Sequence, residues 1–187
     1  MNSTAAAIAT HVPTGTWSVD PSHSTVGFSV KHLGIATVRG RFEDFEGTLD
    51  VGEDISSARA YGTAQAVSVN TNDAQRDDHL RSPDFFGAEA NPALRFESTA
   101  IRPLDDETFE IEGDLTMNGV TNAVTLKAEV QGTEIDPWDN HRVALEVTGQ
   151  LNRGDWNMTF NQALGSGNVL VSDKVKLSLD VSAVKQA

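Results

Sequence analysis

The chain has 187 residues, with 27 acidic side chains, 14 basic ones and no cysteine. Its formal net charge of -13 argues against nucleic acid as a partner, because a phosphate backbone requires a basic surface, and against lasting attachment to an anionic membrane. The absence of cysteine excludes disulfide scaffolds, thiolate metal sites and cysteine nucleophiles.

The chain is expected to begin with a disordered tail, residues 1–15, followed by a single domain over residues 16–187. Residues 1–13 contain no Lys or Arg, and the apolar run at residues 5–9 is shorter than the apolar core of a signal peptide. No segment is long enough to span a bilayer, so no stable membrane anchor is expected. We expect a cytoplasmic protein, although a chain whose leader had been removed would read the same.

Apolar and polar residues alternate along the first half of the domain, which predicts a series of β-strands. Their apolar faces are Trp17 and Val19; Val26, Phe28 and Val30 with His32; Val38, Gly40 and Phe42; Leu49 and Val51; residues 60–69; and Leu94, Phe96 and Ser98. Between the first two strands, residues 20–23 (Asp-Pro-Ser-His) predict a type I turn with Pro at its second position.

A polar segment breaks the alternation and predicts one short helix near residues 72–82. Asn72 is a suitable N-cap, and Asp77 and Arg81 have the spacing of an ion pair on a helix. Pro83 then ends the helix. We expect this helix to cover a barrel mouth as a lid; a plain connector between sheet edges is the alternative.

Residues 109–130 predict a β-hairpin. Asn118-Gly119 favours a type I′ turn, in which both central residues have positive φ. With a two-residue turn, Met117 faces Val120, Gly113 faces Val124 and Ile111 faces Leu126. All three pairs lie on one side of the ribbon, so the turn and the apolar pattern agree on a single register.

Two more alternating stretches, residues 142–151 and 174–182, bring the expected total to about eight to ten strands. This number of strands indicates an all-β sandwich or barrel. The strands are long, and Gly40, Gly113 and Gly149 lie on apolar faces, which favours a barrel. These inward glycines either turn barrel corners or leave room for a ligand.

Several of these segments together resemble the YceI-like family. The similar segments are residues 69–86 (VNTNDAQRDDHLRSPDFF), 113–121 (GDLTMNGVT), 136–138 (DPW), 17–24 and 28–34 (FSVKHLG). The resemblance extends from Thr16 to Val184 in the order and spacing of the family. It implies a lipocalin-like fold, an eight-stranded antiparallel barrel around a deep hydrophobic tunnel, and a polyisoprenoid or similar long-chain amphiphile as ligand.

The chain differs from the family pattern at three points. Many members are exported, whereas no leader is recognised here, and this puts a periplasmic role in doubt. Asn70 stands where Asp is common, and Pro83 replaces a small residue. Neither substitution is expected to change the pocket.

The residues favour binding over catalysis. Burying a prenyl chain yields about 0.8 kcal/mol per CH₂-sized unit, so a five-carbon unit contributes about 3 to 4 kcal/mol before costs. A head-group hydrogen bond contributes about 1 to 3 kcal/mol, so the tail should dominate the affinity. The alternative is a barrel filled by its own side chains, but the low aromatic content of 6% favours a hollow interior. The predicted ligand-binding residues are Phe28, Val30, His32, Phe42, Arg76, His79, Leu80, Phe96, Leu115 and Phe160.

A phosphate or pyrophosphate head group would need cationic anchors at the mouth. Arg76 and His79 lie one turn apart on the predicted helix, and His32 extends the apolar face of its strand. Alternatively, Arg76 and His79 pair with neighbouring carboxylates of this acidic region.

No metal site is expected, because none of the five histidines stands at ligand spacing with another His or a carboxylate. The sequence also lacks a Gly-x-Ser-x-Gly elbow and a glycine-rich phosphate loop. Residues 153–155 read Arg-Gly-Asp, which we interpret as a turn between strands.

Three functions remain: a soluble carrier of an isoprenoid quinone or polyprenyl phosphate, an enzyme acting on such a lipid with His79 and Asp77 as acid and base, and a stress protein that holds fatty-acyl or other amphiphiles. The carrier is the main prediction, without catalytic residues or a cofactor other than the bound lipid. A homodimer is a further expectation.

Overall fold

The computed structural model describes residues 12–187 and contains one continuous antiparallel sheet of eleven strand segments. The strands are β1 (Gly15–Val19), β2 (Thr25–His32), β3 (Ala36–Phe42), β4 (Phe45–Val51), β5 (Arg59–Gln65), β6 (Val69–Asn70), β7 (Ala93–Pro103), β8 (Thr108–Met117), β9 (Val120–Ile135), β10 (His141–Asn152) and β11 (Lys174–Lys185). The helices are α2 (Ala74–Arg81) and four 3-10 turns, η1 (Pro21–His23), η2 (Ile55–Ser57), η3 (Ala66–Ser68) and η4 (Arg153–Trp156). Within the described residues, no helix is long and apolar enough to cross a membrane.

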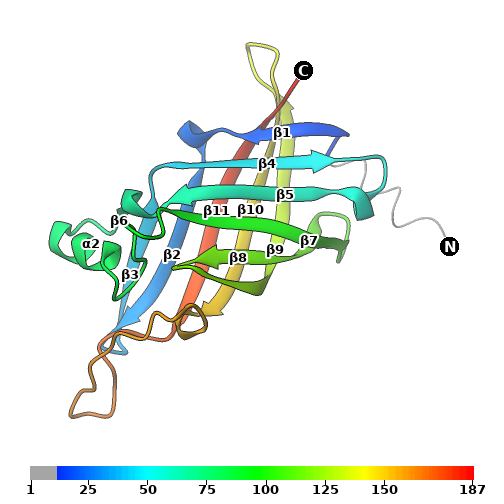
Figure 1. Cartoon of the computed structure of the whole chain (residues 1–187). Helices are drawn as coiled ribbons and strands as arrows, with labels where there is room; N and C mark the ends of the chain where they lie inside the picture. The colour runs from blue at the N-terminus through cyan, green and yellow to red at the C-terminus, as the bar shows by residue number, and fades with distance from the viewer. Residues whose placement is uncertain (1–11) are drawn as a thin grey trace.

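The eleven segments make up a closed barrel of eight strands, because three strands are interrupted. β1 pairs with the end of β11 and β2 pairs with its beginning, so β1 and β2 form one broken strand. In the same way, β3 and β4 form a second broken strand, because β3 pairs with β2 and β4 pairs with β1. β5 and β6 form a third, because β5 pairs with β4 and β6 pairs with β3. The β1–β11 pairing closes the ring. The predicted eight-stranded antiparallel barrel is confirmed, and in Figure 1 β4, β5 and β7 cross in front of β9, β10 and β11.

The interruptions occur where the backbone is hydrogen-bonded by other means. At the first break, Asp20 caps η1, so the predicted turn is a single 3-10 turn. At the second, the hydroxyl of Ser68 accepts hydrogen bonds from the N–H groups of Glu43 and Asp44. Each break therefore bends a long strand without leaving these backbone groups unpaired.

The β8–β9 hairpin is confirmed in turn type and register. Asn118 and Gly119 have φ values of 52° and 73°, as a type I′ turn requires. All three predicted cross-strand pairs occur, including Met117 with Val120. The alternating pattern therefore directs one face of this ribbon into the barrel.

The inward glycines leave room for neighbouring side chains of the barrel, a role that the sequence analysis did not name. A Cβ on Gly40 would lie 2.4 Å from the ring of Phe28, and one on Gly113 would lie 2.4 Å from the ring of Phe96. Gly149 likewise accommodates Leu126 at 2.5 Å. Each glycine leaves the space in which a neighbouring large side chain lies flat against the inner wall.

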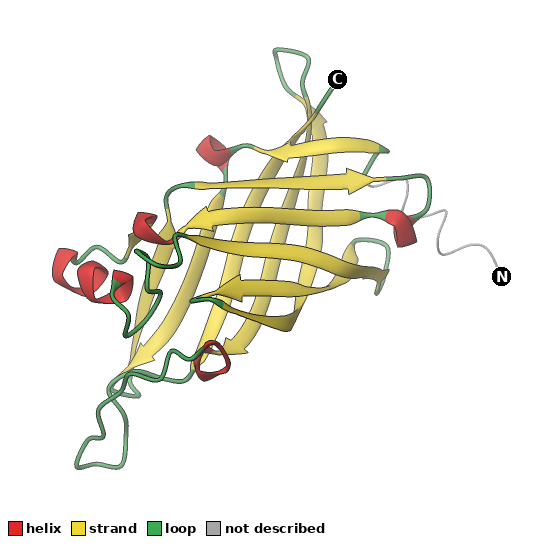
Figure 2. Ribbon diagram, in the orientation of Figure 1, coloured by secondary structure: helices red, strands yellow, loops and turns green. Residues whose placement is uncertain are grey.

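The helix covers one end of the barrel, as predicted, but its local contacts differ from the prediction (Figure 2). The N-cap is Asp73, whose carboxylate accepts from the Arg76 N–H at 2.9 Å, because Asn72 has a left-handed φ of 63°. Arg81 pairs with Asp78 instead of Asp77. Asp77 is buried and accepts hydrogen bonds from the N–H and hydroxyl of Thr71, which removes it from the helix surface.

The expected tail, residues 1–15, falls mostly outside the described residues. Where the structure describes it, the chain is packed: Val12 is buried, and the carbonyl of Pro13 accepts a hydrogen bond from the indole of Trp17 at 3.0 Å. Packing against the barrel therefore reaches at least as far as Val12, and strand β1 begins at Gly15.

The two ends of the barrel are packed differently. At the end where β1 meets β11, Trp17, Val51, Ile101, Phe109 and Val143 are buried and form a solid core. At the other end lie α2, the β2–β3 hairpin and the loop 157–173 (Figure 1). The solid end supplies much of the apolar burial that stabilises the fold.

A charged clamp joins the β9–β10 hairpin to the β1–β2 break near the solid end. Arg142 donates to Asp136 at 2.8 Å and to Asp20 at 2.9 Å. Hydrogen bonds from His23, Ser22 and Arg142 hold the pKa of Asp20 well below its usual range. Partial burial would raise the pKa of Asp136, but hydrogen bonds from Arg142, Asn140 and the Trp138 N–H outweigh it and lower that pKa.

This clamp predicts a loss of stability in acid. The unfolded chain takes up these two protons near pH 3.8, whereas the folded chain does so only at lower pH. The unfolded state therefore binds more protons below about pH 4, and the free energy of unfolding falls as the pH drops. We expect Arg142→Gln to flatten this fall in urea titrations between neutral pH and pH 3. Arg102→Gln, which removes an exposed ion pair with Glu112, is the control and should keep the wild-type fall. If the free energy of unfolding fell equally steeply with pH in wild type and Arg142→Gln, the clamp would be contradicted.

Candidate functional site

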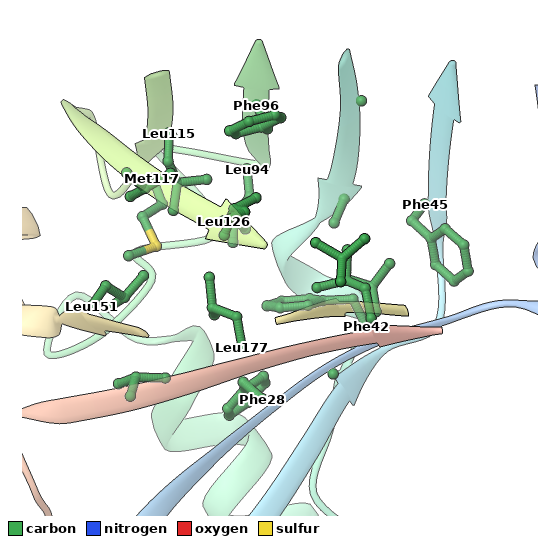
Figure 3. Close-up of a pocket in the computed structure, with 18 of the residues that line it drawn as sticks. Phe28, Phe42, Phe45, Leu94, Phe96, Leu115, Met117, Leu126, Leu151 and Leu177 are labelled. Atoms are coloured by element: carbon green, nitrogen blue, oxygen red, sulfur yellow. The ribbon is translucent and has the colours of Figure 1, made fainter. Parts of the chain in front are cut away.

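A large apolar cavity lies inside the barrel, towards the end that α2 covers. Its volume is ≈ 500 Å³, within the range of about 300 to 1,000 Å³ typical of small-molecule sites. In Figure 3, Leu177 of β11 and Leu94 of β7 extend from opposite walls into the same space. The interior is therefore hollow here, although the barrel is solid at its other end.

The hollow arises because the inward-facing side chains are too few and too small to meet at the barrel axis. Phe28, Phe96, Leu115 and Leu177 all face inward and line the cavity, yet they remain only partly buried. Each therefore exposes apolar surface that lacks a protein partner. Such surface is favourably covered by the chain of an apolar ligand.

All ten residues predicted to bind ligand line this one cavity. Phe28, Val30, His32, Phe42, Arg76, His79, Leu80, Phe96, Leu115 and Phe160 come from β2, β3, α2, β7, β8 and the loop 157–173. The structure thus brings together residues that are far apart in the sequence. Their contact with a ligand remains a prediction.

The sequence analysis did not include several other lining residues. One group, the inward row of β11, contains Val175, Leu177, Leu179, Val181 and Ala183. The sequence analysis recognised the alternating pattern of this strand. The reasoning that selected Phe28 and Val30 as inward residues of β2 could therefore have selected these residues as well. Phe85 has no comparable signal, because it lies in an irregular segment after α2.

The mouth of the cavity combines aromatic and polar side chains. The ring of His79 packs against both Phe85 and Phe160, with centroid distances of 5.0 Å and 4.6 Å, and those two rings are 5.6 Å from each other. Its Nε2 is 2.8 Å from a carboxylate oxygen of Asp84. His32 is exposed and also lines the cavity, so the cavity reaches solvent at this end.

Of the two cationic candidates on the helix, only His79 contacts a carboxylate through its side chain. Arg76 instead donates from Nε to the hydroxyl of Thr71 and from Nη2 to the carbonyl of Thr71, both at 2.7 Å. Arg76 appears in no ion pair among the described residues. The suggested pairing of these side chains with neighbouring carboxylates is therefore seen for His79 and not for Arg76.

Arg153 is a buried cation that the sequence analysis assigned to a simple turn. It lines the cavity, and its guanidinium donates to the carbonyls of Met158, Val171 and Ser172. Burial lowers its pKa, and the carboxylate of Asp173 opposes that shift from 3.6 Å. Arg153 thus holds the loop 157–173 over the barrel end and places a positive charge beside the cavity.

The acid–base pair required by the enzymatic alternative is not formed. His79 contacts Asp84, whereas Asp77 contacts Thr71. Residues two apart on a helix point to nearly opposite sides, so these two side chains cannot act on one substrate atom. Within residues 12–187, no group of three His, Asp or Glu side chains is placed to hold a metal ion.

A closed eight-stranded antiparallel barrel around an apolar cavity defines a lipocalin-like protein. The YceI-like domain family matches residues 17–183, and the chain belongs to this family. It is 39% identical over 165 residues to Protein YceI of Salmonella arizonae, an alignment that covers 88% of this chain and 83% of the relative.

Solved structures show the same fold. The Campylobacter jejuni YCEI protein is 28% identical, with a TM-score of 0.72 over 84% of this chain and 90% of that one. A polyisoprenoid binding domain from Saccharophagus degradans, implicated in plant cell wall breakdown, is 13% identical, with a TM-score of 0.70 over 91% of this chain and 98% of that one. At this low identity the second likeness concerns the fold alone.

The difference between the hollow and solid ends predicts opposite responses to overpacking. Val26 lines the cavity and Val143 belongs to the solid core. We expect Val143→Phe to lower the free energy of unfolding by about 1 to 3 kcal/mol, whereas Val26→Phe should cost clearly less, because its ring can enter the cavity. Urea unfolding of both variants tests this, and an equal loss at the two sites would show that the cavity cannot accept a side chain.

Proposed function

We propose that this protein binds a long-chain isoprenoid lipid in the barrel cavity and carries it through water. The observation that carries the proposal is the row of inward-facing apolar side chains left partly uncovered around ≈ 500 Å³ of space. Membership of the YceI-like family and the likeness to a polyisoprenoid binding domain support a lipid-binding barrel.

The chemistry of the cavity divides the ligand into a tail and a head. The tail lies among Phe28, Phe96 and Leu177, where each five-carbon unit contributes about 3 to 4 kcal/mol before costs. The head lies at the mouth, near Arg76. A phosphate there would receive a charge-assisted hydrogen bond of about 1.5 to 3 kcal/mol. The tail therefore sets the affinity, and the head sets the orientation.

An isoprenoid quinone and a polyprenyl phosphate both meet this description. The phosphate is the better match to the cationic mouth, where Arg76 forms no ion pair among the described residues and Arg153 lies beside the cavity. A straight fatty-acyl chain is the second candidate, because most of the lining is apolar. Catalysis has no comparable support, since His79 and Asp77 point to different partners. The cytoplasmic location and the homodimer remain predictions.

Affinity should follow tail length. We expect each added five-carbon unit in a series of prenols to raise the affinity at least tenfold until the cavity is filled, measured by displacement of an apolar fluorescent dye. Leu115→Trp should weaken binding of every member, because the indole occupies the cavity. Leu104→Trp, at an exposed leucine outside the barrel, is the matched control and should bind like wild type. Affinity independent of tail length, or equal for the two variants, would contradict an internal tail site.

Organic extraction of freshly purified protein distinguishes the candidate lipids. Mass spectrometry that finds one prenyl lipid supports the proposal, and a mixture of fatty-acyl chains supports the second candidate.

For a phosphate-bearing prenyl lipid, Arg76→Gln should lower the affinity about tenfold while the uncharged prenol binds unchanged.

A further inference from the structure

The outer wall beside the cavity mouth has a charge opposite to that of the whole protein. Residues 21–42 form the longest stretch of the chain without Asp or Glu, although the chain carries 27 acidic side chains. This stretch includes β2 and β3. Residues 156–172, which form most of the loop at the same end, also contain no acid. Two acid-free segments thus meet at the mouth of a protein with a net charge of -13.

Strand alternation collects basic side chains on this wall. We call the basic face the set Lys31, Arg39, Arg41, Lys174 and Lys176, all of them exposed. Each lies one residue from an inward-facing position of β2, β3 or β11, and therefore points outward. The register places Lys176 opposite Ser29 and Ser29 opposite Arg39, so neutral hydroxyl groups separate the charges.

The charges of the basic face are largely uncompensated. Arg41 pairs with Glu43 at 3.1 Å, whereas the other four form no ion pair with any residue that the structure describes. The ammonium group of Lys31 donates to the hydroxyl of Thr37 at 2.8 Å. Five of the 14 basic residues of the chain thus lie together on one face, which the net charge of the whole chain does not reveal.

Two exposed apolar side chains lie at the tip next to the basic face. Ile35, in the β2–β3 turn, is 76% exposed, and Val169, in the loop 157–173, is 39% exposed. The two segments are joined, because the Leu33 N–H donates to the carbonyl of Leu170 at 3.0 Å. The mouth therefore has an apolar tip flanked by basic groups.

We propose that this tip and the basic face are the surface by which the protein docks reversibly on an anionic lipid bilayer. The inference rests on the proposed function, since a carrier must bring its cavity mouth to the membrane that supplies or receives the lipid. Each basic residue near an anionic surface strengthens attraction about fivefold in affinity, and the apolar tip can enter the interfacial region.

The same charge distribution accounts for the reversibility. The rest of the surface is strongly acidic and is repelled by anionic lipid, so the protein approaches with the basic face first and does not remain attached. The other rim of the mouth, formed by α2, carries Asp73, Asp78 and Asp84. Attraction is therefore confined to the β2–β3 side, and the barrel should tilt towards it.

Vesicle flotation with the full chain tests the docking. Wild type should float with phosphatidylcholine vesicles that contain phosphatidylglycerol, should not float with phosphatidylcholine alone, and should be released by high salt. Lys31→Gln/Lys174→Gln/Lys176→Gln should lower the apparent affinity for anionic vesicles about a hundredfold, at about fivefold per charge. Arg59→Gln/Arg102→Gln/Lys185→Gln removes the same charge from β5, β7 and β11 near the solid end of the barrel, and should float with anionic vesicles as wild type does.

The apolar tip is tested separately. Ile35→Ser/Val169→Ser should weaken flotation and slow transfer of a bound prenol to vesicles, whereas Val67→Ser/Leu104→Ser, at exposed apolar sites elsewhere, should do neither. All four variants should bind prenol in solution as wild type does, because none of the substituted residues borders the cavity.

The results separate the two proposals. Normal prenol binding in solution without any flotation of wild type would overturn the docking surface and leave the carrier function intact. Absence of prenol binding would instead overturn the carrier function. Equal flotation of the two charge variants would overturn the assignment to the basic face. Binding of polyglutamate as tight as that of anionic vesicles, with no effect of Ile35→Ser/Val169→Ser, would indicate an acidic protein partner and also overturn the proposal.

Discussion

The closure of the sheet between β1 and β11 is the constraint on which the rest of the structure depends. The β1–β11 pairing closes the ring, so most of the wall is held by hydrogen bonds between strands, which do not require a filled interior. The three broken strands allow this ring to bend, and Ser68 satisfies the backbone at one of the breaks. Because the ring closes, the barrel can leave part of its interior empty; residues 36–40 of β3 have no second partner strand, at the end where α2 and the loop 157–173 lie.

The barrel divides stability and binding between its two ends. The core around Trp17 and Val143 buries apolar side chains tightly, which stabilises the fold. The other end leaves Phe28, Phe96 and Leu177 partly uncovered, at a cost in stability that an apolar ligand would recover. Glycines opposite the large rings let those rings lie along the wall, which keeps the centre of the cavity open.

Charge is distributed along the same axis. The acidic total keeps the protein soluble and repels anionic surfaces, while the basic face lies beside the mouth. The net charge led to an expectation against lasting membrane attachment, and the basic face is consistent with that expectation while providing for brief contact. A local arrangement of charges can thus reverse at one end of a molecule what its total charge implies for the whole.

Periodicity alone determined the strands, the β8–β9 register and the position of the helix, because a period of two and an Asn-Gly turn are local properties of the chain. It also placed six of the predicted ligand-binding residues, those on β2, β3, β7 and β8, on one cavity, since inward positions of a closed barrel share one interior. Only the tertiary structure decided where the interior is solid and that Arg153 is buried beneath its loop. Those features depend on contacts between segments distant in the chain, and side-chain volumes summed across a barrel cannot be read from any single strand.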